Sequence, residues 1–297
     1  MSAELAETLT GWYAGAAREL PWRAPGAGAW PVLLSEVMLQ QTPVARVLPV
    51  YEAWLRRWPT PSELAAAPAG AAVRMWGKLG YPRRALRLHE CAGVLVARFG
   101  GAVPQELDAL LSLPGVGAYT ARAVAVFAFG ARHPVVDTNV RRVIARAVLG
   151  RGEAGAPSAA RDLAATEAVL PPEPRHAARV SAALMELGAL ICTARNPKCG
   201  SCPLASCAWR RAGSPAYGGP RGHPQRFAGT DRQVRGLLLD VLRADAEPVS
   251  RAALDAVWPD PAQRERALRT LIADGLIDAL PAQRYALPGH SCRGGGL

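Results

Sequence analysis

Four cysteines stand close together in the second half of the chain. Their spacing is C-x6-C-x2-C-x4-C, which places four thiols within sixteen residues: Cys192, Cys199, Cys202 and Cys207. A cluster this dense in a chain without secretory features predicts metal ligation before disulfide bonding. Zinc and iron–sulfur clusters both accept four thiolates, so the spacing alone leaves both kinds of centre open.

Two carboxylates lie in contexts that favour different protonation states. Glu36 lies in LLSEVMLQQT, a helical stretch of mainly apolar residues, where desolvation would raise its pKa and suit a general acid. Asp137 lies directly before a helical pattern in VVDTNVRRV, the position of an N-cap. An acid and an anion together can break a glycosidic bond. An exposed helix glutamate and a plain helix cap are the ordinary alternatives.

A glycine-rich turn, LPGVG at residues 113–117, connects two helical stretches. Gly115 and Gly117 permit positive φ angles and close approach, so that backbone N–H groups can meet a phosphate oxygen. This turn predicts a binding site for a phosphate of a nucleic-acid backbone. An ordinary connection between two helices is the alternative.

The composition favours a polyanionic partner. A formal charge of +11 and a pI near 10 suit DNA, because phosphate neutralisation supplies most of the sequence-independent affinity. The chain has 33 arginines but only two lysines, Lys78 and Lys198, so any lysine chemistry has few candidates. No signal peptide and no run of eighteen apolar residues is present, which predicts a cytoplasmic protein without membrane contact.

The elements that must position these groups are helices. From Glu4 to about Arg211, helix-length segments alternate with short Pro/Gly breaks, so the predicted fold class is mainly α. Residues 212–230, AGSPAYGGPRGHPQRFAGT, cannot propagate a helix and are predicted to be a linker.

A separate small domain is expected after the linker. Three helical patterns are followed by two short extended runs, an order that predicts a winged-helix-like domain at residues 231–288 and a disordered tail at 289–297. The helical patterns lie at about 231–244, 250–257 and 261–273, and the extended runs at 276–280 and 284–287.

Taken together, the motifs resemble the adenine-glycosylase family of the helix-hairpin-helix, iron–sulfur DNA glycosylase superfamily. LPGVGAYTARAV is similar to the superfamily hairpin, while LSEVMLQQT and the D-x-N-V-x-R-V pattern at Asp137 are similar to the adenine enzymes. The resemblance covers residues 4–211. It implies a two-lobed body over 1–211: a six-helix lobe with the hairpin at about 24–132, and a cluster-bearing lobe formed by 1–23 and 133–211.

The resemblance implies an enzyme that hydrolyses the glycosidic bond of adenine mispaired with 8-oxoguanine or guanine. Glu36 would protonate the leaving adenine, Asp137 would stabilise the oxocarbenium-like sugar, and Asn139 would orient Asp137 and water. The four cysteines would hold a [4Fe–4S] cluster. A monomer acting on double-stranded DNA at the nucleoid is expected.

The resemblance also implies the DNA contacts. Gln41 and Tyr81 would enter the duplex beside the extruded nucleotide, since a base must leave the stack to be excised. The full set of expected DNA- and base-binding residues is Leu20, Trp22 and Arg23 of LPWR, Gln41 and Thr42 of QQT, Tyr81 of LGY, and Gly115 and Gly117 of the hairpin.

A missing lysine predicts the reaction type. Bifunctional relatives carry a lysine two residues after the second hairpin glycine, where its amine attacks the sugar. Here that position is Tyr119, which we count with the catalytic residues, and we expect hydrolysis without strand cleavage. A bifunctional endonuclease III-like enzyme and a thymine/uracil mismatch glycosylase are the enzymatic alternatives. An iron–sulfur winged-helix DNA-binding regulator is the non-enzymatic one, although it leaves Glu36 and the hairpin without a role.

Three features depart from the family pattern. The last cysteine interval is one residue shorter than the usual C-x6-C-x2-C-x5-C, and Ala182 stands where relatives often place Gln or Glu facing adenine. The C-terminal domain does not resemble the nucleotide-pyrophosphohydrolase-like module that contacts 8-oxoguanine in many relatives. It could dock on DNA through the helix at 261–273, or it could stabilise the body or bind a protein.

Overall fold

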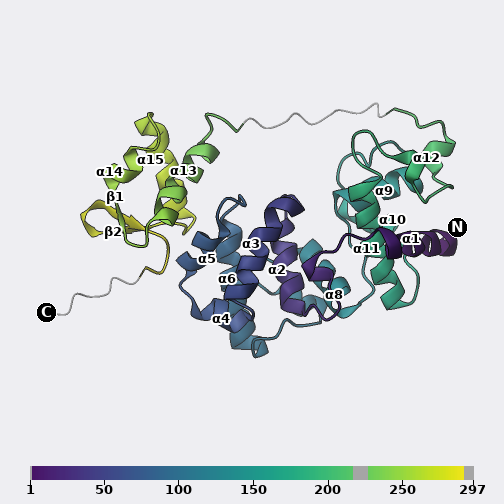
Figure 1. Cartoon of the computed structure of the whole chain (residues 1–297), viewed down its shortest axis with the longest axis horizontal. Helices are drawn as coiled ribbons and strands as arrows, with labels where there is room; N and C mark the ends of the chain where they lie inside the picture. Colours follow the sequence, from purple (N-terminus) through teal and green to yellow (C-terminus); the bar gives the residue numbers. More distant parts are fainter. Residues whose placement is uncertain (1, 217–226, 291–297) are drawn as a thin grey trace. The chain divides into compact units, whose positions relative to one another are not determined.

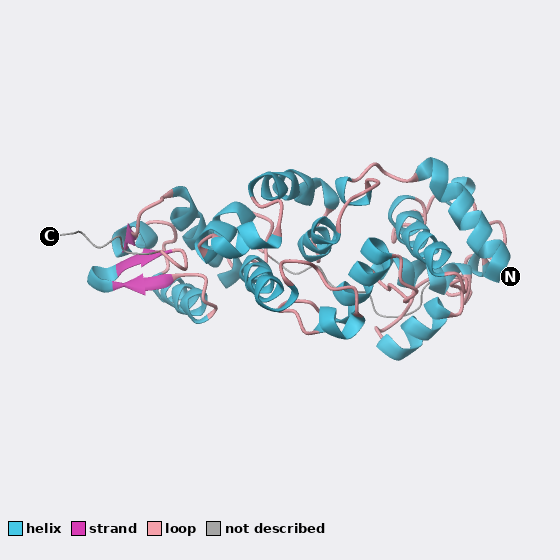
Figure 2. Ribbon diagram, turned by 90° about the horizontal axis from the view of Figure 1, so that it is seen from below, coloured by secondary structure: helices cyan, strands magenta, loops and turns pink. Residues whose placement is uncertain are grey.

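The computed structural model describes residues 2–216 and 227–290, which form helices and one small antiparallel sheet (Figures 1 and 2). The predicted fold class, mainly α, is confirmed. The chain divides into two compact units, one within residues 1–33, 105–112 and 116–222, the other within 34–104, 113–115 and 223–297. The predicted lobe and linker boundaries stay predictions. Most of the expected linker falls on 217–226, and most of the expected tail on 291–297, outside the described residues.

The first unit is built from helices whose ends are marked by caps. Asp137 and Glu173 cap α9 and α11 with their carboxylates, and Gly130 ends α8 with a left-handed φ of 71°. The core lies where α1, α9 and α11 meet, around Leu9 and Leu184. Its helices are α1 (Ser2–Ala16), η1 (Pro21–Arg23), α7 (Leu107–Leu111), α8 (Ala118–Phe129), α9 (Thr138–Ala147), α10 (Ala159–Glu167), α11 (Pro174–Leu190), η2 (Cys199–Ser201) and α12 (Ala208–Arg211).

The second unit begins within α2 (Ala29–Leu39), whose second half carries Glu36. In α6, apolar residues recur at helical spacing from Ala85 to Leu95 and pack against α4 and α5. Trp54 and Trp76 meet edge to face, with ring centroids 5.6 Å apart, and fix α3 against α5. The remaining helices of this part are α3 (Val44–Arg57), α4 (Pro61–Ala66), α5 (Ala69–Trp76) and α6 (Arg83–Phe99).

The C-terminal part of the second unit has the winged-helix order of elements, as predicted. Its sheet order is β1-β3-β2, with Tyr285 of β3 opposite Val249 on one side and Ala279 on the other. Figure 2 shows its two longer strands as magenta arrows beside helices. The elements are α13 (Asp231–Ala244), β1 (Val249–Ser250), α14 (Arg251–Asp255), α15 (Pro261–Ala273), β2 (Asp278–Leu280), η3 (Pro281–Gln283) and β3 (Arg284–Ala286). Among the described helices of the whole chain, none combines the length and apolarity needed to cross a bilayer.

Candidate active site and cluster site

Glu36 is a buried acid, as its apolar neighbours in sequence suggested. Its side chain is on the second half of α2, and the residue is 6% exposed. Leu33, Leu34 and Val37 around it on the same helix are buried as well. Burial disfavours a charged carboxylate, so the position suits a group that carries a proton to a leaving base.

Asp137 is the N-cap of α9. One carboxylate oxygen accepts from the Val140 amide at 2.7 Å, and the other accepts from Asn139 Nδ2 at 2.9 Å. Burial raises the pKa of Asp137, while these hydrogen bonds and the charge of Arg142 act in the opposite direction. The carboxylate is therefore desolvated but held in one orientation, as a group that stabilises a nearby cation must be.

A chain of hydrogen bonds joins this aspartate to the cysteine loop. Arg142 donates to Asn139 Oδ1 at 2.6 Å, to the Gly188 carbonyl at 2.7 Å and to the Cys192 carbonyl at 2.6 Å. One turn further along α9, Arg146 donates to the Thr193 carbonyl at 2.7 Å and to Cys192 Sγ at 3.6 Å. The helix that presents Asp137 thus also anchors the start of the cysteine loop.

Gly188 makes room for this arrangement. A Cβ at position 188 would lie 2.6 Å from Asn139 Cβ and 2.9 Å from the Asn139 carbonyl oxygen. The backbone of α11 therefore approaches α9 more closely than any side chain would allow. Only glycine at this point lets Asn139 keep its position beside Asp137.

The four cysteines of the loop are free thiols. Burial raises the pKa of Cys202, and the charges of Cys192, Cys199 and Cys207 raise it further, so the four sulfurs are within electrostatic reach. No three His, Cys, Asp or Glu side chains among the described residues converge as they would on a single ion. A [4Fe–4S] cube takes one thiolate at each of four irons and so spreads its ligands more widely. The donor set fits such a cluster.

Basic residues surround the cysteine loop. Arg195, Lys198, Arg210 and Arg211 are exposed, and Arg210 donates to the Cys199 carbonyl at 3.2 Å. This surface has the charge that a DNA backbone requires.

In the second unit, one arginine ties together the loops of QQT and LGY. Arg84 Nη1 donates to the carbonyls of Val37, Met38 and Gln40 at 2.8–3.0 Å. Its Nη2 donates to Thr42 Oγ1 at 3.0 Å and to the Gly80 carbonyl at 3.1 Å. The guanidinium therefore connects the end of the Glu36 helix with the loop before α6.

The two expected wedge residues lie at these loops in strained backbone. Gln41 and Tyr81 have φ angles of 54° and 48°, in the left-handed region that non-glycine residues seldom adopt. Tyr81 is 53% exposed, and the Arg84 guanidinium lies 5.6 Å from the centroid of its ring. Thr42 is buried and donates weakly to the Leu79 carbonyl at 3.4 Å, which links the two loops directly.

The hairpin glycines differ from each other. Gly115 has a φ of 77°, and a Cβ there would lie 2.7 Å from Arg87 Cβ, so both its angle and its surroundings require glycine. Gly117 has an ordinary φ of −89° and caps α8 with no side-chain bond, and a Cβ there would meet nothing within 4 Å. The expectation of positive φ thus holds for Gly115 alone, while Gly117 leaves open space over the first amides of α8. Tyr119 is partly buried against the cluster of Ala123, Val126 and Val135.

The LPWR segment is held by a buried ion pair that the sequence did not reveal. Leu20 and Trp22 are buried, and Arg23 Nη1 donates to Glu186 Oε2 at 3.0 Å. Arg18 binds the same carboxylate through its backbone N–H and its guanidinium, and these bonds lower the pKa of Glu186 against the opposing effect of burial. Glu186 is completely buried and thus fixes the segment.

Three positioning residues were therefore absent from the sequence-based set: Arg84, Arg142 and Glu186. Their signal in the sequence was weak. Glu186 is a charged residue inside the otherwise apolar run VSAALMELG, and that alone could have marked it as paired. The two arginines stand among many others and carry no such mark.

Comparison with known proteins agrees with this geometry. A family model described as "HhH-GPD superfamily base excision DNA repair protein" matches residues 34–166. One described as "Iron-sulfur binding domain of endonuclease III" matches residues 192–206, which contain three of the four cysteines. The match ends one residue before Cys207, at the shortened interval.

Curated relatives extend the similarity to as much as 95% of the chain. The adenine DNA glycosylase of Mycolicibacterium smegmatis is 59% identical over 283 residues, 95% of each chain. The human adenine DNA glycosylase is 39% identical over 209 residues, which cover 67% of this chain and 38% of the human one. Among solved structures, a thermostable thymine-DNA glycosylase matches with a TM-score of 0.64 and 27% identity, covering 71% of this chain and 97% of that one. The chain therefore belongs to the adenine DNA glycosylase family within the HhH-GPD superfamily, and it is a DNA-binding repair enzyme with a [4Fe–4S] cluster.

Proposed function

We propose that the chain removes adenine mispaired with 8-oxoguanine or guanine from double-stranded DNA by hydrolysis. The observation that carries this proposal is the 59% identity, over 95% of the chain, to an adenine DNA glycosylase. That span is too long to leave out the C-terminal domain, so the whole architecture is shared. The reading as a non-enzymatic regulator has no comparable support.

The side chains support a division of labour. Glu36, buried on α2, donates a proton to the departing adenine, while Asp137 in its ionised form stabilises the positive charge on the sugar. Asn139 donates to Asp137 and thereby fixes the carboxylate. The four cysteines of residues 192–207 would hold the cluster, which would organise this loop.

The sequence offers no amine for a covalent step. Tyr119 stands where a Schiff-base lysine would be. Lys78 pairs with Asp240 and is largely exposed, and Lys198 lies in the cysteine loop. The enzyme therefore acts through water alone and leaves the DNA strand intact.

DNA binding combines a grip on the backbone with insertion into the duplex. The amides at the start of α8, beside Gly117, bind a phosphate. Gln41 and Tyr81 enter the stack next to the extruded nucleotide, and Leu20, Trp22, Arg23 and Thr42 complete the expected contacts. The protein binds as a monomer.

A glycosylase assay tests the proposal. Duplexes with adenine opposite 8-oxoguanine or guanine, and with thymine or uracil opposite guanine, are incubated with the wild type and with Asp137→Asn. Adenine release by the wild type alone is expected, and reduction with borohydride during the reaction should trap no covalent adduct. Release of thymine or uracil instead of adenine, or efficient trapping that disappears in Lys78→Ala, would overturn the assignment.

A further inference from the structure

The C-terminal domain lacks the charge of a DNA-docking domain. Residues 231–290 carry eight arginines, no lysine and nine carboxylates, whereas residues 1–211 carry 24 basic and 15 acidic residues. On α15, the helix that would enter a groove, Arg264 and Arg266 are paired with Asp255 and Asp231, while Arg269 is exposed outside these pairs. A phosphate-binding face needs several unpaired positive charges, and one exposed arginine on α15, in a domain whose carboxylates outnumber its basic residues, does not supply them. The domain therefore calls for another role.

The domain makes a close backbone contact with the N-terminal end of α5. The Gly70 amide donates to the Pro288 carbonyl at 2.6 Å, which satisfies one of the N–H groups that a helix start leaves open. A Cβ on Gly70 would lie 2.7 Å from the Pro288 oxygen and 2.9 Å from Leu287 Cβ. The chain after β3 thus lies against α5 at a distance that only glycine permits.

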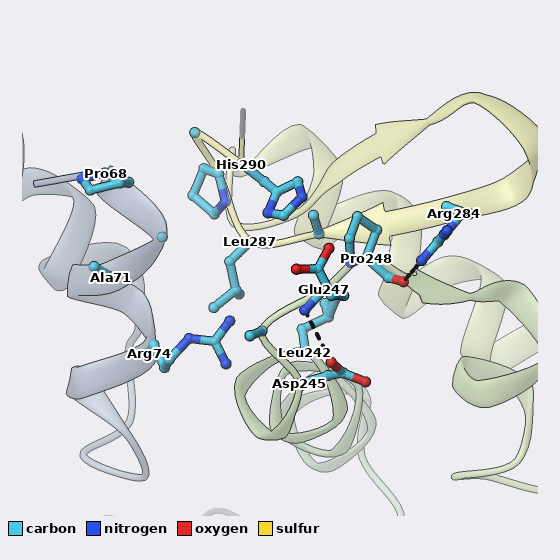
Figure 3. Close-up of a pocket in the computed structure, with 15 residues that line it drawn as sticks. Pro68, Ala71, Arg74, Leu242, Asp245, Glu247, Pro248, Arg284, Leu287 and His290 are labelled. Atoms are coloured by element: carbon cyan, nitrogen blue, oxygen red, sulfur yellow. Dashed lines mark hydrogen bonds between the residues drawn. The ribbon is translucent and has the colours of Figure 1, made fainter. Parts of the chain in front are cut away.

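A second contact lies at the other end of α5. Arg243 of α13 donates through Nε to the Val73 carbonyl at 3.1 Å, and Arg74 of α5 donates to the Arg243 carbonyl in return. Figure 3 shows Arg74 extending from α5 toward the C-terminal domain, below Leu287. Burial lowers the pKa of Arg243, as expected for a guanidinium enclosed at an interface.

Two ion pairs continue this contact along the loop that follows α5. Lys78 Nζ lies 3.3 Å from Asp240 Oδ2, and Arg83 Nη1 lies 3.3 Å from Asp274 Oδ1. Both basic side chains are largely exposed, so each pair contributes little by itself. The positions of these ion pairs matter more than their strength, because Lys78 precedes Tyr81 and Arg83 follows it in the sequence.

Between the two buried contacts, the surfaces leave a cavity of about 460 Å³ (Figure 3). Its lining includes the charged side chains of Arg74, Glu247 and Arg284. The interface is therefore not continuously apolar. The position of the C-terminal domain on α5 depends on the close contacts at the two ends of α5.

We propose that the C-terminal domain is a clamp that positions the Tyr81 loop for insertion into DNA. It fixes α5 at Gly70 and at Val73, and α5 continues directly into the loop of residues 77–82. The domain thereby affects base extrusion and discrimination of the opposite base without touching either. This role rests on the proposed insertion of Tyr81.

Gly70→Ala in the full-length protein tests the clamp. Alanine favours a helix over glycine, so the substitution strengthens α5 itself while its Cβ collides with Leu287 and Pro288. Gly93→Ala is the matched control, because Gly93 lies inside α6 with nothing within 4 Å of the added Cβ. The first readout is amide hydrogen exchange over residues 69–82 without DNA. Faster exchange in Gly70→Ala and unchanged exchange in Gly93→Ala are expected.

The second readout is a double-mutant cycle with Tyr81→Ala, measured as single-turnover release of adenine opposite 8-oxoguanine and opposite guanine. If the clamp acts through Tyr81, Gly70→Ala slows release by roughly ten- to a hundredfold and adds nothing in the Tyr81→Ala background. Additive losses, or exchange that stays at the wild-type rate, would overturn the clamp. Since exchange is measured without substrate, failure of the wild type to release adenine would reject the proposed function and leave the exchange test valid.

Discussion

Replacement of Arg84 by methionine should destabilise the protein and loosen the two loops that carry the expected wedge residues, Gln41 and Tyr81. Methionine keeps the length of the side chain and its helix propensity but removes every donor. Nη1 has two hydrogens and serves three carbonyls at the end of α2, at 2.8–3.0 Å. If only these two hydrogens are counted, at about 1.5–2 kcal/mol each for charge-assisted bonds, the unfolding free energy falls by about 3–4 kcal/mol.

Urea unfolding measures this loss, and Arg87→Met is the matched control. Arg87 lies one turn further along α6 and pairs with Glu90 at 2.7 Å on the surface, so its replacement should change the unfolding free energy by less than about 1 kcal/mol. Arg84→Lys should recover part of the loss, because an ammonium keeps the charge but cannot reach all five acceptors.

Function supplies an independent readout for Arg84. A fluorescent base analogue next to the target adenine should show weaker unstacking with Arg84→Met, because the ends of both loops lose their common anchor. The reasoning fails if Arg84→Met unfolds at the same urea concentration as Arg87→Met, or if unstacking matches that of the wild type.

Three further predictions concern the first unit. Asn139→Ala removes a donor that lowers the pKa of Asp137. Since the proposed mechanism uses ionised Asp137, the acid limb of the single-turnover rate should move to higher pH, and an unmoved limb would contradict the proposed role. Gly188→Ala should displace Asn139, lower the unfolding free energy by about 1–3 kcal/mol and slow excision, while the iron content stays normal. The control is Gly11→Ala, whose added Cβ meets nothing within 4 Å, and it should change neither stability nor excision rate. Equal excision rates in the two variants would reject the close-approach argument. Cys207→Ser should lose iron and visible absorption despite the shortened interval, and Cys91→Ser should retain both; full iron content in Cys207→Ser would remove it from the ligand set.

Helical periodicity and the Pro/Gly breaks between helices predicted the fold well, because both depend on residues that are close together in the sequence. The three helices of the C-terminal domain and its strands β2 and β3 lie close to their predicted positions. Strand β1 was missed, since Val249–Ser250 is too short to show alternation and exists only through pairing with β3. The burial of Glu36 and the cap at Asp137 followed from local sequence for the same reason.

The contacts that position the site could not be predicted, because they join distant segments. Arg142 reaches Gly188 and Cys192, and Arg18 reaches Glu186, across separations that no local pattern encodes. The docking of the C-terminal domain on Gly70 is of the same kind. Sequence predicted the candidate reacting groups, whereas only the fold shows what holds them.

The preference for arginine over lysine has two physical consequences here. Without a suitably placed amine, imine chemistry on the sugar has no nucleophile, which favours hydrolysis. A planar guanidinium also offers several N–H groups in one rigid fork, so Arg84 and Arg142 can each bind carbonyls from more than one segment. A lysine at either place would concentrate its charge on one atom and could not span the same acceptors. The composition that disfavours imine chemistry therefore also supplies the guanidinium groups that fix the expected catalytic and wedge residues.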